Sequence, residues 1–322
     1  MRELSATAGA VRFDVPPNRT RPRSSAVRSS AVRSSAVIGT ALVLLLAVAG
    51  YLIYHSFTKA SPYVALAPGC QAGTGTQAIS LDADQAGIAA TIAGVAARHK
   101  LPRQAVTIAY AAALQESQLQ NLDYGDRDSV GVFQQRPSQG WGTKSELENP
   151  VYATTKFFAA LVQVPGYATM PVDEAAQDVQ HSGDGSAYEQ WASVAAQLAG
   201  YFTGASPHGV SCWYVPPARP SLANVGRSLT ETFGPQGGNR ILVAVTTARS
   251  GKKKPGDAVV QAQRDEAWTV AGWLVAHAQD YGISEVRYAG YDWTAADGSM
   301  GWQREVTPSA KTNPARGSIV AG

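Results

Sequence analysis

The chain has 322 residues, of which 45% are hydrophobic and 16% are charged, so it holds enough apolar material for a core and enough length for two domains. The formal net charge of +3 is unevenly distributed along the chain, because residues 1–35 contain seven Arg and only two acidic residues, Glu3 and Asp14. The remainder holds 20 basic and 22 acidic side chains (27 less 7, and 24 less 2). This balance excludes a basic nucleic-acid surface outside the N-terminal tail, so we expect no nucleic-acid partner.

The N-terminal part reads as a tail followed by a membrane helix. Residues 1–35 are expected to be a disordered cytoplasmic tail. They contain most of the repeat "SSAVRSSAVRSSAV" (24–37), which is rich in Ser and Arg. Residues 36–54 include no charged side chain over 19 positions, which is enough to span a bilayer as a helix. The alternative is a cleaved signal peptide, but the apolar run is long and no small-residue cleavage site follows closely. Because the Arg-rich side stays in the cytoplasm, we expect a single-pass protein of the cell membrane with residues 60–322 outside.

Two cysteines, Cys70 and Cys212, bound the segment that follows. Residues 55–79 are rich in Gly, Ala, Pro, Ser and Thr and are expected to be a linker. Outside the cytoplasm, a pair of cysteines favours a disulfide over two unrelated thiols. Closing so long a loop would contribute up to roughly 5 kcal/mol in the chain-entropy model.

Residues 80–212 are expected to form an all-helical domain without strands. Apolar residues recur at helical spacing in each of its segments. Pro or acidic residues stand at several of the expected helix starts. The predicted helices cover residues 82–100, 103–117, 149–164, 171–182 and 186–202.

The rest of the chain has a different pattern, with an expected linker at 213–228, a small α/β module at 229–308 and a flexible tail at 309–322. Within the module, β-branched residues predict strands on either side of a long amphipathic helix. The expected elements are a strand at 240–248, the helix at 258–282 and a strand at 284–293. The expected fold class is therefore mainly α, with one transmembrane helix, an all-helical domain and a small C-terminal α/β module.

Glu116 stands at the end of an Ala-rich apolar helix pattern, and the chain turns polar and acidic directly after it. A sugar-cleaving site needs a carboxylic acid held beside the glycosidic oxygen. A helix end followed by an open loop meets that need. A lone Glu at a helix end is ordinarily a solvated charge, so the residues around Glu116 decide between the two interpretations.

The spacing after Glu116 resembles that of the lysozyme-like lytic transglycosylases of bacterial cell walls. In that family a Glu-Ser pair closes a buried helix, and a Gly-Leu-Met-Gln-type run follows at the distance that separates Glu116-Ser117 from "GVFQ" (131–134) here. The likeness extends over most of residues 80–212 and is nearest to a subset of actinobacterial extracellular proteins. It implies a lysozyme-like helical domain in which Glu116 is the sole acid and base and no cofactor is needed.

The same resemblance, together with aromatic residues suited to sugar faces, indicates where substrate would bind. The family's Gly-Gln run lines the sugar cleft. Two departures are Asp128-Ser129, where the family has Gly-Ala, and Val179-Gln180, where it has Tyr-Asn. No His and Cys cluster has the spacing of a metal site. The candidate substrate-binding residues are Ser117, Gly131, Phe133, Gln134, Trp141, Gln180 and Tyr188.

We therefore expect a peptidoglycan muramidase, a lytic transglycosylase that cuts the β-1,4 bond between N-acetylmuramic acid and N-acetylglucosamine. A strict hydrolase would need a second carboxylate, for which Asp123, Asp126 and Asp128 are candidates. The alternative from another class is a non-catalytic lysozyme-like module that holds peptidoglycan within an envelope assembly. The expected partners are glycan strands, the membrane through residues 36–54, and wall polymer or an envelope protein at the C-terminal module.

Overall fold

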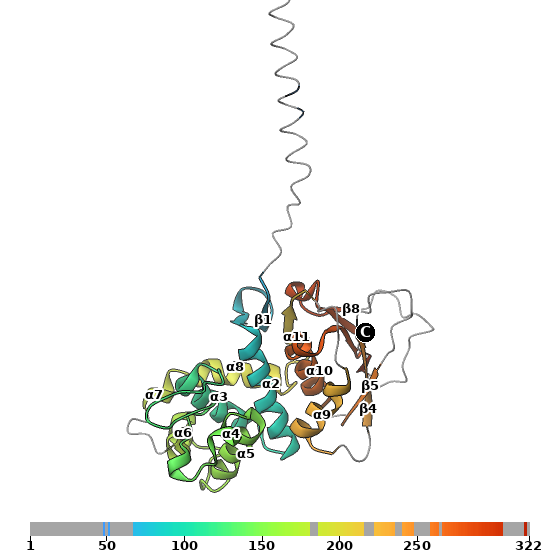
Figure 1. Cartoon of the computed structure of the whole chain (residues 1–322). Coiled ribbons are helices and arrows are strands. Elements are labelled where there is room, and N and C mark those ends of the chain that lie inside the picture. Colours follow the sequence, from blue (N-terminus) through green and yellow to red (C-terminus); the bar gives the residue numbers. More distant parts are fainter. Residues whose placement is uncertain are drawn as a thin grey trace, which may run out of the picture. The chain divides into compact units, whose positions relative to one another are not determined.

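The computed structural model describes Val48 and Tyr51 and then residues 67–180, 186–215, 222–235, 240–247, 258–263, 266–304 and 319–320. Residues Ala67–Gly322 form one compact unit (Figure 1). Residues Met1–Leu66 form a second unit. The fold described below is that of the larger unit.

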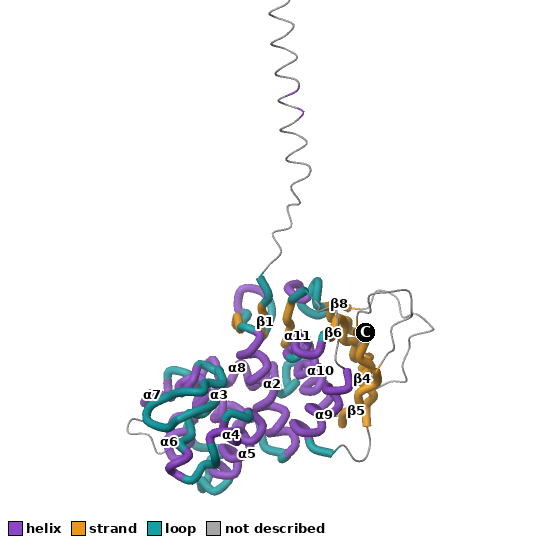
Figure 2. Tube along the Cα trace, in the orientation of Figure 1, coloured by secondary structure: helices purple, strands orange, loops and turns teal. Residues whose placement is uncertain are grey.

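Helices dominate the first half of this unit (Figure 2). Two Ala-rich helices, α2 and α3, form its centre, because most of the residues of both are buried. Helices α5, α6, α7 and α8 pack around α3. The bounds are α2 (Ala83–Arg98), α3 (Arg103–Ser117), α4 (Lys144–Leu147), α5 (Pro150–Leu161), α6 (Val172–Gln180), α7 (Ser186–Glu189) and α8 (Ala192–Phe202), with short 3-10 turns at Gly75–Gln77 and Pro137–Gln139.

The starts of these helices follow from local capping. Asp82 accepts a hydrogen bond from the Gln85 backbone, and the Gln85 side chain bonds back to the Asp82 N–H, which makes a capping box at α2. Thr143 and Glu146 form the same box at α4. At α5, the Asn149 side chain accepts from two backbone N–H groups of the first turn. These caps satisfy N–H groups that have no partner within a helix.

A three-stranded antiparallel sheet joins the start of the unit to the end of its helical half. Strand β1 (Gly69–Ala72) lies between β2 (Ile79–Leu81) and β3 (Val210–Trp213). Its register places Cys70 opposite Cys212, and the predicted disulfide between them is present. The disulfide therefore links two neighbouring strands while closing a loop of 142 positions.

The described residues of the C-terminal part, from 222 onward, include a six-stranded sheet and three α-helices. The strand order is β5-β4-β9-β6-β7-β8, with a further β4–β6 pairing, and every pairing is antiparallel except β4 with β9. The bounds are α9 (Leu222–Phe233), β4 (Arg240–Thr247), β5 (Ala258–Gln263), α10 (Ala267–Ala276), α11 (Ala278–Tyr281), β6 (Ile283–Tyr288), β7 (Tyr291–Thr294), a 3-10 turn at Gly298–Met300, β8 (Gln303–Arg304) and β9 (Ile319–Val320).

This C-terminal part packs directly on the helical half. Helix α2 contacts α9 and α10, and α10 also contacts β3. Trp293 donates from Nε1 to the Cys212 carbonyl at 3.0 Å, and Trp302 donates to the Val210 carbonyl at 2.8 Å. Both indoles are at least nine-tenths buried. One continuous core therefore runs through both halves.

The fold class expected from the sequence is wrong in two respects. The domain expected to be all-helical carries the sheet β1-β2-β3, whose strands Gly69–Ala72 and Ile79–Leu81 begin in the expected linker. The expected α/β module is a mainly antiparallel sheet packed into the same core rather than a separate module. Among the described residues, no helix combines the length and apolar character needed to cross a membrane. The expected membrane helix at 36–54 lies outside these residues apart from Val48 and Tyr51, as does the tail at 1–35.

Several element boundaries also differ from those expected. Residues 258–263 form β5 rather than the start of a helix, because "AVVQAQ" pairs with the β-branched strand β4. The strand expected at 284–293 is a hairpin, since Ala289 and Gly290 both have positive φ (54° and 78°) and form a two-residue turn. Helix α9 begins inside the expected linker 213–228, and β9 lies in the expected flexible tail.

Candidate functional site

Glu116 lies in the last turn of α3, a helix whose preceding residues from Ala105 to Leu114 are all buried. The helix ends after Ser117 because Gln118 and Leu119 adopt left-handed backbone conformations, with φ of 56° and 60°. Leu119 is fully buried and fixes this reversal in the core. Glu116 itself is half-buried, so a rigid helix presents its carboxyl group at the edge of the core.

Tyr188 on α7 holds the carboxyl group of Glu116. Its hydroxyl donates a 2.7 Å hydrogen bond to Oε1 of Glu116. Tyr188 is 1% exposed, so its ring is locked by packing and its hydroxyl is delivered in one place. The two residues are 72 positions apart in the sequence and are joined only by the fold. A hydroxyl donor at this distance orients the carboxyl group of a Glu side chain.

Gln115, the residue before Glu116, makes a second connection between the same elements. Its Oε1 accepts hydrogen bonds from Trp191 Nε1 at 2.8 Å and from Gln190 Nε2 at 3.2 Å. Trp191 is half-buried and packs against the core. The last turn of α3 is therefore held to the segment 188–191 on both sides of the peptide bond between Gln115 and Glu116.

Ser117 connects the helix end to the run 131–134. Its hydroxyl donates to the Val132 carbonyl at 2.7 Å and lies 3.1 Å from the Ala113 carbonyl, while it accepts from the Gln120 N–H. Ser117 is 6% exposed. These contacts give Ser117 a bracing position, and they explain why a Ser directly after the Glu suits this geometry.

The run Gly131–Gln134 forms a tight turn closed by the bridge between Val130 and Gln135. Gly131 has φ of 78°, and a Cβ atom there would lie 2.3 Å from the Leu147 carbonyl oxygen, so only glycine fits. Phe133 is fully buried and stacks on Phe157 with ring centroids 4.5 Å apart. Its side chain therefore fills the core instead of facing a ligand.

Two glutamines tie this turn to its neighbours. Gln134 donates from Nε2 to the carbonyls of Tyr124 and Gly131, each at 3.2 Å. Gln180, at the end of α6, donates to the Phe133 carbonyl at 2.9 Å. Both side chains are half-buried, so each holds backbone while keeping part of its amide accessible. Trp141, another candidate, is half-buried and packs against the core after the 3-10 turn at Pro137–Gln139.

The acidic segment after α3 divides into two kinds of carboxylate. Asp128 accepts hydrogen bonds from Arg136 Nε at 2.8 Å, from the Ser138 N–H at 2.7 Å and from the Ser138 hydroxyl at 3.0 Å. These bonds, that of Arg136 first, hold the pKa of Asp128 well below its usual range. Asp123 and Asp126 are exposed. Asp128 is therefore a brace for the loop, which its position in the sequence did not reveal.

The structure thus brings Glu116, Ser117 and Tyr188 into direct or adjacent contact and connects Gln180 to the Gly131–Gln134 turn. The sequence reasoning missed Gln115, Gln190 and the Arg136–Ser138 clamp. Gln115 carried a signal, because it adjoins the acid and is polar at the end of an apolar helix. The clamp carried none, since it depends on the course of the loop.

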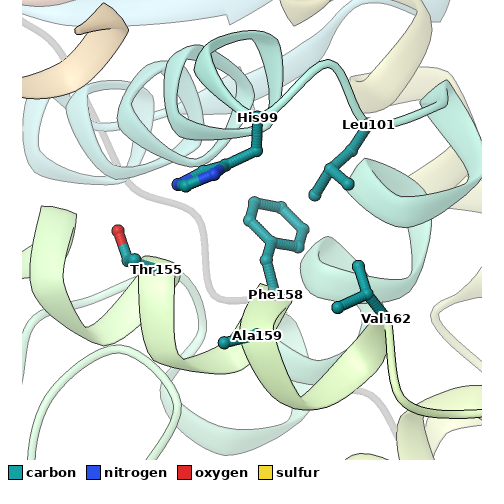
Figure 3. Close-up of a pocket in the computed structure, with 6 residues that line it drawn as sticks. All are labelled: His99, Leu101, Thr155, Phe158, Ala159 and Val162. Carbon is teal, nitrogen blue, oxygen red and sulfur yellow. The ribbon is translucent and has the colours of Figure 1, made fainter.

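A separate hollow of about 220 Å³ lies between the end of α2 and α5 (Figure 3). Its walls are mostly apolar, and Phe158 projects into it from α5. Partial burial and neighbouring Arg98 lower the pKa of His99 at its rim. The hollow has no carboxylate among its lining residues. Its lining residues are His99, Leu101, Thr155, Phe158, Ala159 and Val162.

Within the described part of the chain, no three His, Cys, Asp or Glu side chains come together as a metal site would require. The arrangement at Glu116 is instead that of a single positioned carboxyl group.

Comparison with protein-family models finds none that matches the chain, and comparison with curated proteins finds no matching relative.

Proposed function

We propose that the chain is a peptidoglycan-cleaving muramidase, a lytic transglycosylase in which Glu116 is both the acid and the base. The observation that carries this proposal is the 2.7 Å hydrogen bond from buried Tyr188 to the half-buried carboxyl group of Glu116. A carboxyl group fixed on a rigid helix and oriented by a neighbour is what proton transfer to a glycosidic oxygen requires. The resemblance of the Glu-Ser and Gly-Val-Phe-Gln spacing to wall-cleaving enzymes supplies the substrate class.

In this proposal Glu116 first donates its proton to the oxygen that bridges the two sugars. Positive charge then develops at the anomeric carbon of the muramic acid, and the acetamido group of that sugar stabilises it. Glu116, now a carboxylate, takes the proton of the 6-hydroxyl of the same sugar. The 6-oxygen closes on the anomeric carbon, because an intramolecular nucleophile has a large effective concentration. The product is a 1,6-anhydro sugar, and Glu116 ends protonated as it began.

Of the three Asp residues that a strict hydrolase could use, one is already engaged by other side chains and backbone. Asp128 is occupied by Arg136 and Ser138, and such a brace is poorly suited to activate a water. Asp123 and Asp126 are exposed on the loop. The engagement of Asp128 leaves one candidate base fewer, which supports the transglycosylase over the strict hydrolase.

The test is Glu116→Gln, which keeps the size and shape of the side chain and removes the acid. We expect no release of soluble fragments from purified peptidoglycan, with an unchanged circular dichroism spectrum and Tm. The matched control is Glu174→Gln, an exposed position on α6, which keeps full activity. Activity retained by a folded Glu116→Gln protein contradicts the assignment. A wild-type protein that sediments with peptidoglycan and never cleaves it would instead make the chain a binding module.

The mass of the fragments separates the two enzyme mechanisms. Ring closure gives anhydro-muramyl ends, which are one water lighter than the ends from hydrolysis. Reducing ends that disappear on changing Asp123 or Asp126 to Asn would show a hydrolase.

We also propose that this unit works outside the cytoplasm. The support is the buried Cys70–Cys212 disulfide, since such bonds persist in oxidising compartments. Peptidoglycan is reached from that side.

A further inference from the structure

A second pocket, of about 340 Å³, lies where the two halves of the core meet. It is bounded by the first turns of α2, by the segment that follows α3, by Pro150 at the start of α5 and by the junction of α10 and α11. This volume is within the range of pockets that bind small molecules. The Glu116 mechanism uses none of its residues.

Part of the pocket lining is apolar. Ala83, Ile88, Leu122 and Pro150 contribute hydrocarbon to it. A Cβ atom at Gly87 would lie 3.1 Å from the His277 ring, so the glycine allows His277 to approach α2 closely. These apolar residues suit an alkyl chain of a few carbons.

The rest of the lining is polar and includes two exposed carboxylates. Asp84 and Asp280 contribute carboxylates from two elements far apart in the sequence, and the lining contains no Lys or Arg. Asn121 donates with its amide nitrogen to the Glu148 carbonyl, which leaves its side-chain oxygen as an acceptor. Among the ion pairs of the described residues, Asp280 has His277 as its partner and Asp84 appears in none. The charged groups that a ligand would meet are therefore acceptors.

A chain of hydrogen bonds fixes Asp280 to α2. His277 Nδ1 lies 3.0 Å from Asp280 Oδ2, and its Nε2 lies 3.2 Å from Thr91 Oγ1. The order hydroxyl, imidazole and carboxylate is that of a hydrolytic triad. Thr91, however, is 5% exposed in the middle of α2, where the backbone N–H groups are used within the helix and cannot serve as oxyanion donors. The hydrogen bonds from Thr91 through His277 therefore position the carboxylate of Asp280.

We propose that this pocket binds a primary ammonium group carried on an alkyl stem, as in a lysine-like side chain. An ammonium group has three donors and no acceptor, which matches the carboxylates of Asp84 and Asp280 and the oxygen of Asn121. The stem packs on Ile88, Leu122 and their neighbours. A divalent metal fits less well, because the described residues offer no cluster of three ligating side chains.

The experiment uses two matched probes, Nα-acetyl-lysine amide and its Nε-acetylated form, titrated into the wild-type protein and followed by calorimetry and by the NMR signals of the His277 ring. We expect saturable binding of the first probe and none of the second, which differs by the lost positive charge. Asp84→Asn and Asp280→Asn each weaken binding up to about fivefold, as expected for ion pairs of exposed carboxylates. Asp280→Lys abolishes binding by placing a competing ammonium group in the pocket.

Asp178→Asn, an exposed position on α6 outside the pocket, is the control for loss of a negative charge and leaves the affinity unchanged. Equal affinity for the two probes, or unchanged affinity in both Asn variants and in Asp280→Lys, overturns the proposal, as does absence of saturable binding to the folded wild-type protein. Glu116→Gln retains the binding. The outcome is therefore independent of whether the chain cleaves peptidoglycan.

Discussion

The hydroxyl of Tyr188 donates a hydrogen bond of 2.7 Å to Oε1 of Glu116. One residue comes from the short helix α7 and the other from the last turn of α3. Because packing holds the buried Tyr188 side chain in place, its hydroxyl orients the Glu116 carboxyl group. Five side chains in this region form hydrogen bonds that restrain the last turn of α3 or the Gly131–Gln134 turn, namely those of Tyr188, Gln115, Ser117, Gln134 and Gln180.

Removing the hydroxyl in Tyr188→Phe is expected to lower the rate of peptidoglycan cleavage at least about tenfold, because the Glu116 carboxyl group loses the hydrogen bond that orients it, and a small misplacement of a catalytic group can cost about 100-fold in rate. The rate is measured per folded molecule by release of soluble fragments. The matched control is Tyr110→Phe, whose hydroxyl bonds to the Ala89 carbonyl in the same core at 2.7 Å. That variant loses stability and keeps its rate. If both variants cleave at the wild-type rate, Tyr188 does not position the acid.

Gly131→Ala should destabilise the fold by about 2–4 kcal/mol, because it combines a positive φ with a clash against the Leu147 carbonyl. Gly140→Ala separates the two effects. Gly140 has φ of 81°, with no atom within 4 Å of an added Cβ, so only backbone strain of about 1 kcal/mol is expected. Urea unfolding of both variants measures the difference. Equal losses would mean that the turn moves away from Leu147 without cost.

Removing the disulfide should lower the free energy of unfolding by about 2–5 kcal/mol, because the reduced chain gains the freedom of a long open loop on unfolding. Dithiothreitol should therefore lower the Tm of the wild-type protein. The double variant Cys70→Ser, Cys212→Ser starts at the lower Tm and should not respond to the reductant. A wild-type Tm that dithiothreitol leaves unchanged, with the thiols shown to be free, would contradict this expectation.

Asp128 should make the stability depend on pH in the acid range. The hydrogen bonds from Arg136 and Ser138 lower the pKa of Asp128 in the folded state. In the unfolded chain, Asp128 has the ordinary pKa of an Asp side chain, about 3.9. The stabilisation is therefore complete above about pH 4 and is lost as the pH falls from there through the folded pKa. The Tm difference between the wild type and Asp128→Asn should be constant from about pH 5 to 8 and shrink below about 4.

The control for that experiment is Asp126→Asn on the same loop, where the side chain is 89% exposed. It removes the same negative charge without removing the clamp. A Tm difference for Asp128→Asn that does not change across the acid range would show that the negative charge of Asp128 contributes nothing to the stability.

Much of the helical half could be predicted from the sequence, because its signals are local. The Asp82 and Asn149 caps, Pro102 before α3 and the Ala-rich periodicity lie within a few residues of the helices they start. The disulfide between the two Cys residues could also be predicted, because the expected location outside the cytoplasm favours a disulfide. Glu116 could be singled out as a candidate acid because the spacing between Glu116-Ser117 and the run 131–134 resembles that of a known family.

The remaining features depend on partners distant in the sequence, and only the tertiary structure decided them. "AVVQAQ" is a strand because β4 pairs with it, and a short apolar run by itself suits a helix equally well. The C-terminal part shares one core with the helices because Trp293 and Trp302 reach the carbonyls of β3, 81 and 92 positions away. For the same reason the sequence by itself determined that Glu116 ends a helix, while the fold decided that Tyr188 holds it. A hydrogen bond across 72 positions leaves no periodicity to read, since it arises only when packing fixes both side chains.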